Sequence, residues 1–336
     1  MLQPEHFSKS RLDLIIRMES ETGSSHSFFA GLKSRLTTMS CPTSTRQLLA
    51  WIDEADGEYS RPIFASTLPY FAEAAFTLPA NWFGLSPILL VGPLWASLLL
   101  APQVSVKFNV RLFVAAVLFT IPSLVAWRSF LNGNTVLYKK FFLGKEAIIL
   151  FPFISIAICY WLIENQKLFS MSLYPMWLWM LSLMLVLPAK NKTRRHRPCT
   201  KLKFSKYVNN KHFQAVPRIL AKVAGDASLP SGDAAGSMAF GLTIALAGRI
   251  YFGILIFCFS CLGRVYYVVH HAFDTIAGGL ATVLAYFVST LLFGVSLTSL
   301  RWYHAVLMHN CFILLFLGTF NFNKKPVLKQ GVPAQR

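Results

Sequence analysis

From Trp82 onward the chain is a series of long apolar runs separated by short polar segments. The runs lie at 82–100, 112–127, 147–163, 169–187, 234–262, 271–295 and 303–320. A helix needs about 20 residues to cross the hydrocarbon core of a bilayer. The 234–262 run is too long for one straight span and contains Arg249, which is costly at mid-membrane, so we divide it into two short spans that turn at Gly248 and Arg249. The pattern predicts an all-α polytopic membrane bundle of about six to eight transmembrane helices.

Residues 1–80 form a different kind of region, polar and mixed in charge. They lack the apolar segment of a secretory signal; an organellar transit segment is an alternative, although four early acids weaken it. A short helix is expected at Arg46–Ala55, ended by Gly57. We therefore predict a polar N-terminal tail at 1–80, partly disordered or lying on the membrane surface, a transmembrane helical domain at 81–321 and a basic C-terminal tail at 322–336.

The composition supports this interpretation, because 54% of the residues are hydrophobic and 14% are charged, whereas soluble domains average about 25% charged. The net charge of +18 also fits a nucleic-acid-binding protein. With eight spans, however, and with the N-terminal tail set aside, one face of the membrane holds 20 bases and the other holds five. The positive-inside rule places the crowded face in the cytosol, and its basic loop suits anionic lipids, so no nucleic-acid partner is expected. We expect a multi-pass protein of an endomembrane, such as the endoplasmic reticulum, or of an organelle.

Three short motifs lie on the predicted cytosolic face: KNKTRRHRP at 190–198, LPSGD at 229–233 and GRVYYVVHHAFD at 263–274. Alone, the first is typical of a basic cluster beside a membrane, and the second of a turn that caps a helix. In the third, His270 and Asp274 are four residues apart and would share one face of a helix. The carboxylate would then accept one imidazole N–H and leave the other nitrogen free as a base or nucleophile.

Taken in order, the three motifs resemble the type 2 phosphatidic acid phosphatase superfamily. That family has K-x-x-x-x-x-x-R-P, then P-S-G-H, then S-R-x-x-x-x-x-H-x-x-x-D, and the similarity covers about residues 147–295, the predicted phosphatase core. The resemblance implies an integral membrane, metal-independent phosphatase without a cofactor. Its substrate would be a lipid phosphate monoester such as phosphatidate, a sphingoid base phosphate, or a polyprenyl phosphate or diphosphate. The expected partners are this lipid and the bilayer; no oligomeric state is predicted.

The resemblance also implies a role for each matching residue. The cations Lys190, Arg197 and Arg264 would hold the phosphate oxygens, and backbone N–H groups around Ser231 and Gly232 would add donors at a helix N-terminus. Such positioning and charge stabilisation supply most of the catalysis of phosphoryl transfer. The predicted active site would therefore lie at the cytosolic ends of the helices.

The chemical step implied by the family is an attack by His270 on phosphorus. The resulting phosphohistidine is hydrolysed by water, and Asp274 orients and stabilises the imidazolium.

Two positions depart from the pattern. Asp233 replaces the family's acid histidine, and a carboxyl group is a weak acid catalyst at neutral pH unless its surroundings favour the protonated form. Gly263 replaces a serine and removes a hydroxyl donor. Two alternatives stay open: a lipid phosphotransferase, and a catalytically silent protein that binds or transports a phosphate lipid.

Overall fold

The computed structural model describes residues 45–82, 85–143, 145–224 and 227–322. The chain divides into two units, residues 1–54 and 55–336. In the first unit, residues 45–54 form the beginning of helix α3 (Thr45–Ala65). The second unit contains the rest of α3 and all the other described helices. Within the described ranges there are 14 α-helices and no strand, so the all-α fold is confirmed.

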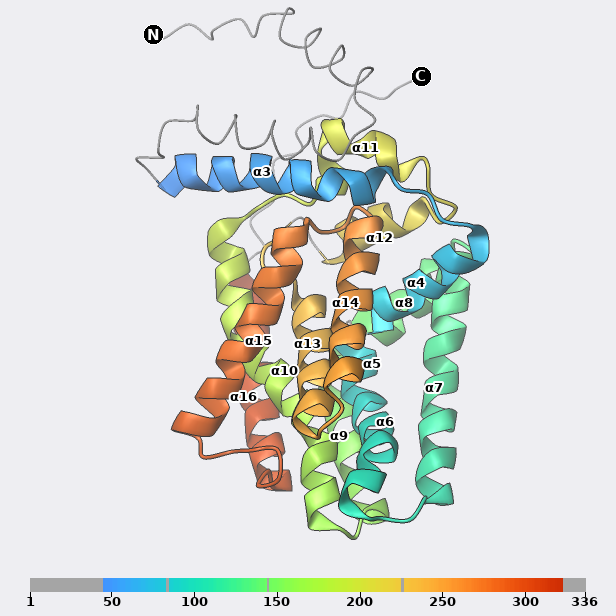
Figure 1. Cartoon of the computed structure of the whole chain (residues 1–336), viewed down its shortest axis with the longest axis vertical. Coiled ribbons are helices and arrows are strands. Elements are labelled where there is room, and N and C mark those ends of the chain that lie inside the picture. The colour runs from blue at the N-terminus through green and yellow to red at the C-terminus, as the bar shows by residue number, and fades with distance from the viewer. Residues whose placement is uncertain (1–44, 83–84, 144, 225–226, 323–336) are drawn as a thin grey trace, which may run out of the picture. The chain divides into compact units, whose positions relative to one another are not determined.

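The apolar runs of the sequence coincide with helices of the second unit (Figure 1). These helices are α5 (Leu85–Leu90), α6 (Gly92–Leu100), α7 (Val110–Leu131), α9 (Lys145–Leu162), α10 (Gln166–Thr193), α13 (Gly232–Leu246), α14 (Ile250–Tyr266), α15 (Ala272–Leu292) and α16 (Trp302–Phe322). The run expected at 82–100 is divided between α5 and α6, and Pro93 at the start of α6 lacks the N–H that a continuous helix would use. The expected turn at Gly248 and Arg249 is confirmed, and Gly248 has a φ of +94°, a conformation that favours glycine.

Short helices connect the long ones. They are α4 (Tyr70–Trp82), η1 (Ala101–Val104), α8 (Thr135–Leu143), η2 (Pro198–Thr200), α11 (Leu202–Val208) and α12 (Ala215–Ala224). The helix expected to end at Gly57 instead continues to Ala65 as α3. Gly57 allows the Phe204 ring of α11 to pack closely against α3, because a Cβ at position 57 would come within 2.9 Å of this ring.

Within the described part of the chain, three helices, α7, α10 and α15, are long and apolar enough to cross a membrane, and shorter apolar helices lie at 147–162 and 250–266. In α15 most exposed side chains are apolar, including Ile276, Leu280 and Leu284, whereas the buried ones beyond Asp274 are small or hydroxylated, including Gly278 and Thr282. Helices that pack inside a bilayer show this distribution, because lipid chains solvate apolar surface and small residues let helix backbones approach. The arrangement therefore agrees with an all-α membrane bundle.

Helix α10 is the centre of the bundle, and every residue from Leu168 to Leu183 is buried. It packs against α6, α13, α15 and α16. Hydrogen bonds of buried polar groups cross between the helices: Trp177 Nε1 donates to Ser289 Oγ at 2.7 Å, and Thr282 Oγ1 donates to the carbonyl oxygen of Ala235 at 2.9 Å. These contacts fix how α10, α13 and α15 lie against one another.

Gly278 sets the spacing between α15 and α13. A Cβ at this position would collide with the carbonyl oxygen of Ser231, at the start of α13. We expect Gly278→Ala to lower the free energy of unfolding by about 1–3 kcal/mol through overpacking, measured as a lower Tm in detergent micelles. Gly279→Ala is the matched control, because its Cβ would meet only the ring edge of Phe257, which can move. Equal Tm values for the two variants would contradict the prediction.

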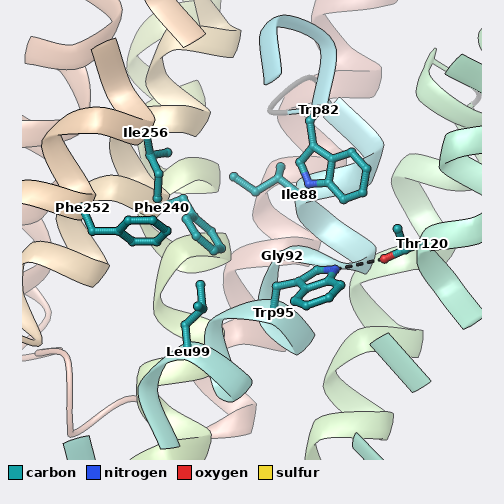
Figure 2. Close-up of a pocket in the computed structure, with 9 residues that line it drawn as sticks. All are labelled: Trp82, Ile88, Gly92, Trp95, Leu99, Thr120, Phe240, Phe252 and Ile256. Carbon is teal, nitrogen blue, oxygen red and sulfur yellow. Dashed lines mark hydrogen bonds between the residues drawn. The ribbon is translucent and has the colours of Figure 1, made fainter. Parts of the chain in front are cut away.

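The bundle also forms an apolar cavity of about 240 Å³ between α4, α5, α6, α7, α13 and α14 (Figure 2). Its lining includes Trp82, Phe240 and Phe252. The hydroxyl group of Thr120 accepts a hydrogen bond from Trp95 Nε1 at 3.0 Å. None of the side chains described around this cavity is an acid or base, so the cavity offers no charged group that could bind a phosphate.

Candidate functional site

The three sequence motifs come together at one end of the bundle, the upper end in Figure 1. Helices α10 and α14 run toward this end and carry Lys190 and Arg264 in their last turns. Helices α13 and α15 start there and carry Asp233 and Asp274 in their first turns. The alternating directions of the four helices thus gather residues that are up to 84 positions apart in the sequence.

His270 and Asp274 are both completely buried, and His270 Nδ1 lies 3.6 Å from Asp274 Oδ2. The sequence predicted that both would share a helix face. Instead, His270 precedes α15, which begins at Ala272, and Asp274 turns back toward it from the first helical turn. His271 is the N-cap, and its backbone N–H donates to Asp274 Oδ2 at 2.9 Å, as in a capping box. This capping box holds the carboxylate beside His270.

The other ring nitrogen, His270 Nε2, lies 3.1 Å from Arg197 Nη1. Arginine has only donors, so the contact requires Nε2 to be the acceptor, with its lone pair unprotonated. Burial first, and then the charge of Arg197, lower the pKa of His270 to about 4, against the opposing effect of Asp274. The imidazole is therefore neutral at pH 7 and keeps a nucleophilic lone pair at Nε2.

The three predicted phosphate-binding cations share this place. Arg197 and Arg264 are 2% and 3% exposed, and Lys190 lies within electrostatic range of both. Arg264 Nη1 is 2.7 Å from Asp233 Oδ2, and the Asp233 side chain is 26% exposed. The Asp233 carboxylate thus binds one of the three cations, Arg264, as a phosphate oxygen would.

The second motif starts α13, and part of its predicted role needs correction. The Ser231 side chain caps the helix by accepting from the backbone N–H of Ala234 at 3.2 Å. The Ser231 N–H donates to the carbonyl oxygen of Asp274 at 2.9 Å, so we exclude this group from the predicted phosphate donors. Gly232 begins the helix proper, and its carbonyl oxygen accepts from Trp179 Nε1 at 3.1 Å. The N–H groups of Gly232 and Asp233 belong to the first turn, where a helix presents donors to an anion.

Gly263 lies where α14 crosses α4. A Cβ there would be 2.9 Å from the Cβ of Ala80 and 3.0 Å from the carbonyl oxygen of Phe76. The serine that the family has at this position would not fit without moving α4. The departure from the family pattern therefore has a packing reason that the sequence alone did not reveal.

Two further charged residues, which sequence reasoning missed, belong to this cluster. Arg195 Nη1 contacts Asp274 Oδ1 at 2.6 Å and Asp56 Oδ2 at 2.7 Å. Arg195 lies inside the first motif, but nothing in a basic run indicates which member turns inward. Asp56 belongs to the region expected to be a polar tail, and no motif marks it. Only the tertiary fold brings it to the third motif.

A comparison with protein families matches residues 172–298 to the PAP2 superfamily. This segment contains all three motifs, and the match confirms the resemblance drawn from them. It supports a phosphatase-type function associated with a membrane. No curated protein and no solved structure matches the chain.

Proposed function

From the PAP2 superfamily core at residues 172–298, we propose that the protein is a membrane phosphatase that hydrolyses the phosphate monoester of a lipid through a phosphohistidine at His270. The observation that carries the proposal is the position of the His270 ring, with Nδ1 facing the Asp274 carboxylate and Nε2 facing Arg197. This geometry orients a neutral nucleophile toward a cation that would bind the phosphate. The bundle's apolar surface keeps such a substrate in the same bilayer as the site.

The proposed reaction has two steps. In the first, His270 Nε2 attacks phosphorus and the bond between phosphorus and the lipid oxygen breaks, while the departing alkoxide takes a proton from Asp233. In the second, water attacks the phosphohistidine, gives a proton to Asp233 and releases inorganic phosphate as the P–N bond breaks. Asp274 stabilises the positive charge of the phosphorylated ring, and the cations Lys190, Arg197 and Arg264 stabilise the charge on the phosphoryl oxygens.

Asp233 needs a proton before it can act as the acid. In the structure, Asp233 Oδ2 is paired with Arg264 Nη1 at 2.7 Å. A phosphate dianion that binds Arg264 would displace the carboxylate and, by like-charge repulsion, favour its protonated form. We propose that substrate binding itself brings about the protonation of Asp233 in this way.

Asp233→Asn tests this role through the leaving group. We expect kcat for a lipid phosphate to fall about 100-fold, within the usual range for loss of an acid catalyst, because an alkoxide leaves poorly without a proton. The rate with p-nitrophenyl phosphate, whose leaving group needs no proton, is expected to change about threefold or less. Both rates are measured by product release in detergent micelles. A similar loss for both substrates would contradict the acid role.

The wild-type protein tests the proposal as a whole. Purified protein in mixed micelles with EDTA is expected to release inorganic phosphate from at least one of phosphatidate, a sphingoid base phosphate or a polyprenyl phosphate. If added alcohols accept the phosphoryl group in place of water, the protein is a phosphotransferase. If the wild type is inactive and Asp233→His gains activity, it is a silent member that binds or transports phosphate lipids.

Sidedness is a separate part of the proposal. We place the site on the cytosolic face of an endomembrane or organelle membrane, because the motif end carries the basic segment 190–222. Protease added outside sealed microsomes, whose outer face is cytosolic, should cleave this segment. Protection of the segment until detergent is added would place the site on the opposite side.

A further inference from the structure

The start of α15 is held by two side chains from α3, more than 200 residues earlier in the sequence. Asp56 Oδ1 accepts from the backbone N–H of Phe273 at 2.9 Å, and Ser60 Oγ accepts from that of Ala272 at 2.8 Å. The first N–H groups of a helix have no partner within the helix and need such acceptors. Both side chains are buried, with Asp56 6% exposed. Residues 55–65 of α3 thereby complete the helix that carries Asp274.

Asp56 does more than cap α15, because its second oxygen binds the guanidinium that also binds Asp274. Arg195 Nη1 lies 2.7 Å from Asp56 and 2.6 Å from Asp274. The Arg195 side chain is 8% exposed and that of Asp274 is 0% exposed, so water screens the three charges weakly. Burial raises the pKa of the Asp56 carboxyl, whereas the Phe273 N–H and Arg195 favour its charged form.

We propose that Asp56 is a positioning residue of the phosphatase reaction, which shares the Arg195 guanidinium with Asp274 and so leaves Asp274 the negative charge that supports His270. This inference rests on the proposed function. With Asp56 neutral, the whole charge of Arg195 would act on Asp274. The carboxylate would then stabilise the imidazolium less, both in the free protein and when His270 is phosphorylated.

The test follows the protonation of His270. The charged groups near His270 are Arg197, Lys190 and Asp274. Those near Asp274 are Arg195, His271 and Asp56. For Asp56→Asn we expect the pKa of His270 to fall by about half a unit, kcat to fall about 10-fold and KM to change less than about twofold. The amide oxygen of the variant still accepts from Phe273, which preserves the cap.

Ser60→Ala is the control for the cap: it removes the acceptor of the Ala272 N–H and a hydrogen bond that Ser60 Oγ donates to Asp56 Oδ1 at 3.3 Å, but it removes no charge. It should leave the pKa of His270 and kcat within about 0.1 unit and twofold of wild type. Arg195→Gln should raise the pKa of His270, since two carboxylates lose their shared cation. The double variant Asp56→Asn/Arg195→Gln should return it close to the wild-type value. The double variant also carries the test if a single variant does not fold, because it removes one charge of each sign and so keeps the net charge of the three groups.

The measurement is an NMR titration of ¹⁵N-histidine-labelled protein in nanodiscs, with kcat and KM for the lipid phosphate measured on the same preparations. An unchanged His270 pKa in Asp56→Asn, or an equal shift in Ser60→Ala, would overturn the role of Asp56. An inactive wild type would overturn the proposed function instead. The titration needs no turnover, so the two failures are distinguishable.

Discussion

His270→Ala is expected to release phosphate from vesicle-borne phosphatidate at least about 1000-fold more slowly than wild type. The ring is the group that the proposed reaction phosphorylates, and its Nε2 lies 3.1 Å from Arg197 Nη1. The assay contains EDTA, so that contaminating metal-dependent phosphatases stay inactive. A brief incubation with ³²P-labelled substrate should also trap an acid-labile phosphoprotein in wild type and none in the variant.

The matched control for this variant is His212→Ala. His212 is an exposed histidine before α12, outside the three motifs, and its ring contacts Tyr70. We expect its activity to remain within about twofold of wild type, as for other surface substitutions. Equal rates for His270→Ala and wild type would refute the assignment of the nucleophile. If His270→Ala is slow but still forms the labelled phosphoprotein, the nucleophile is another residue.

Arg197→Ala is expected to have the second largest effect, a loss of about 100- to 1000-fold in kcat/KM. Arg197 is buried and contacts the attacking nitrogen of His270, so it can bind a phosphoryl oxygen next to the bond that forms. Arg197→Lys should recover only part of the loss, because lysine lacks the planar fork that binds two oxygens at once. Steady-state kinetics and inhibition by inorganic phosphate or vanadate measure both effects.

Arg194→Ala serves as the control for charge in the same segment. Arg194 is exposed and caps the end of α10, with its Nε donating to the carbonyl oxygen of Asn191 at 3.3 Å. We expect a change of about twofold or less. If both variants lose the same activity, the general positive charge of the segment matters and the geometry of Arg197 does not.

The sequence was sufficient to predict the helical bundle because membrane helices are set by long apolar runs, which are local. The turn at Gly248 was predictable for the same reason, since an arginine inside an apolar run marks a helix end. The break between α5 and α6, and the continuation of α3 past Gly57, depend on contacts and backbone bonds outside the local pattern. The hydropathy of the chain therefore predicts where helices lie better than where they begin and end.

The motif residues were also predictable, since their order and spacing are written in one stretch of the chain. Their partners were not. Asp56 reaches Arg195 only because α3 lies beside the start of α15, and the Ser231 N–H is used by Asp274 only because Gly278 lets α13 and α15 approach closely. Contacts of this kind join positions far apart in sequence, and no spacing rule encodes them.

The packing of α4 against Gly263 makes the two departures from the family pattern unequal for protein engineering. At Asp233 the side chain is partly exposed, so the family's histidine can be installed without rebuilding the fold. At Gly263, Ala80 and the Phe76 carbonyl group of α4 fill the space that the Cβ of a serine would need. A design that restores the consensus sequence should therefore change position 233 alone, since the lost hydroxyl at 263 can return only if α4 is redesigned with it.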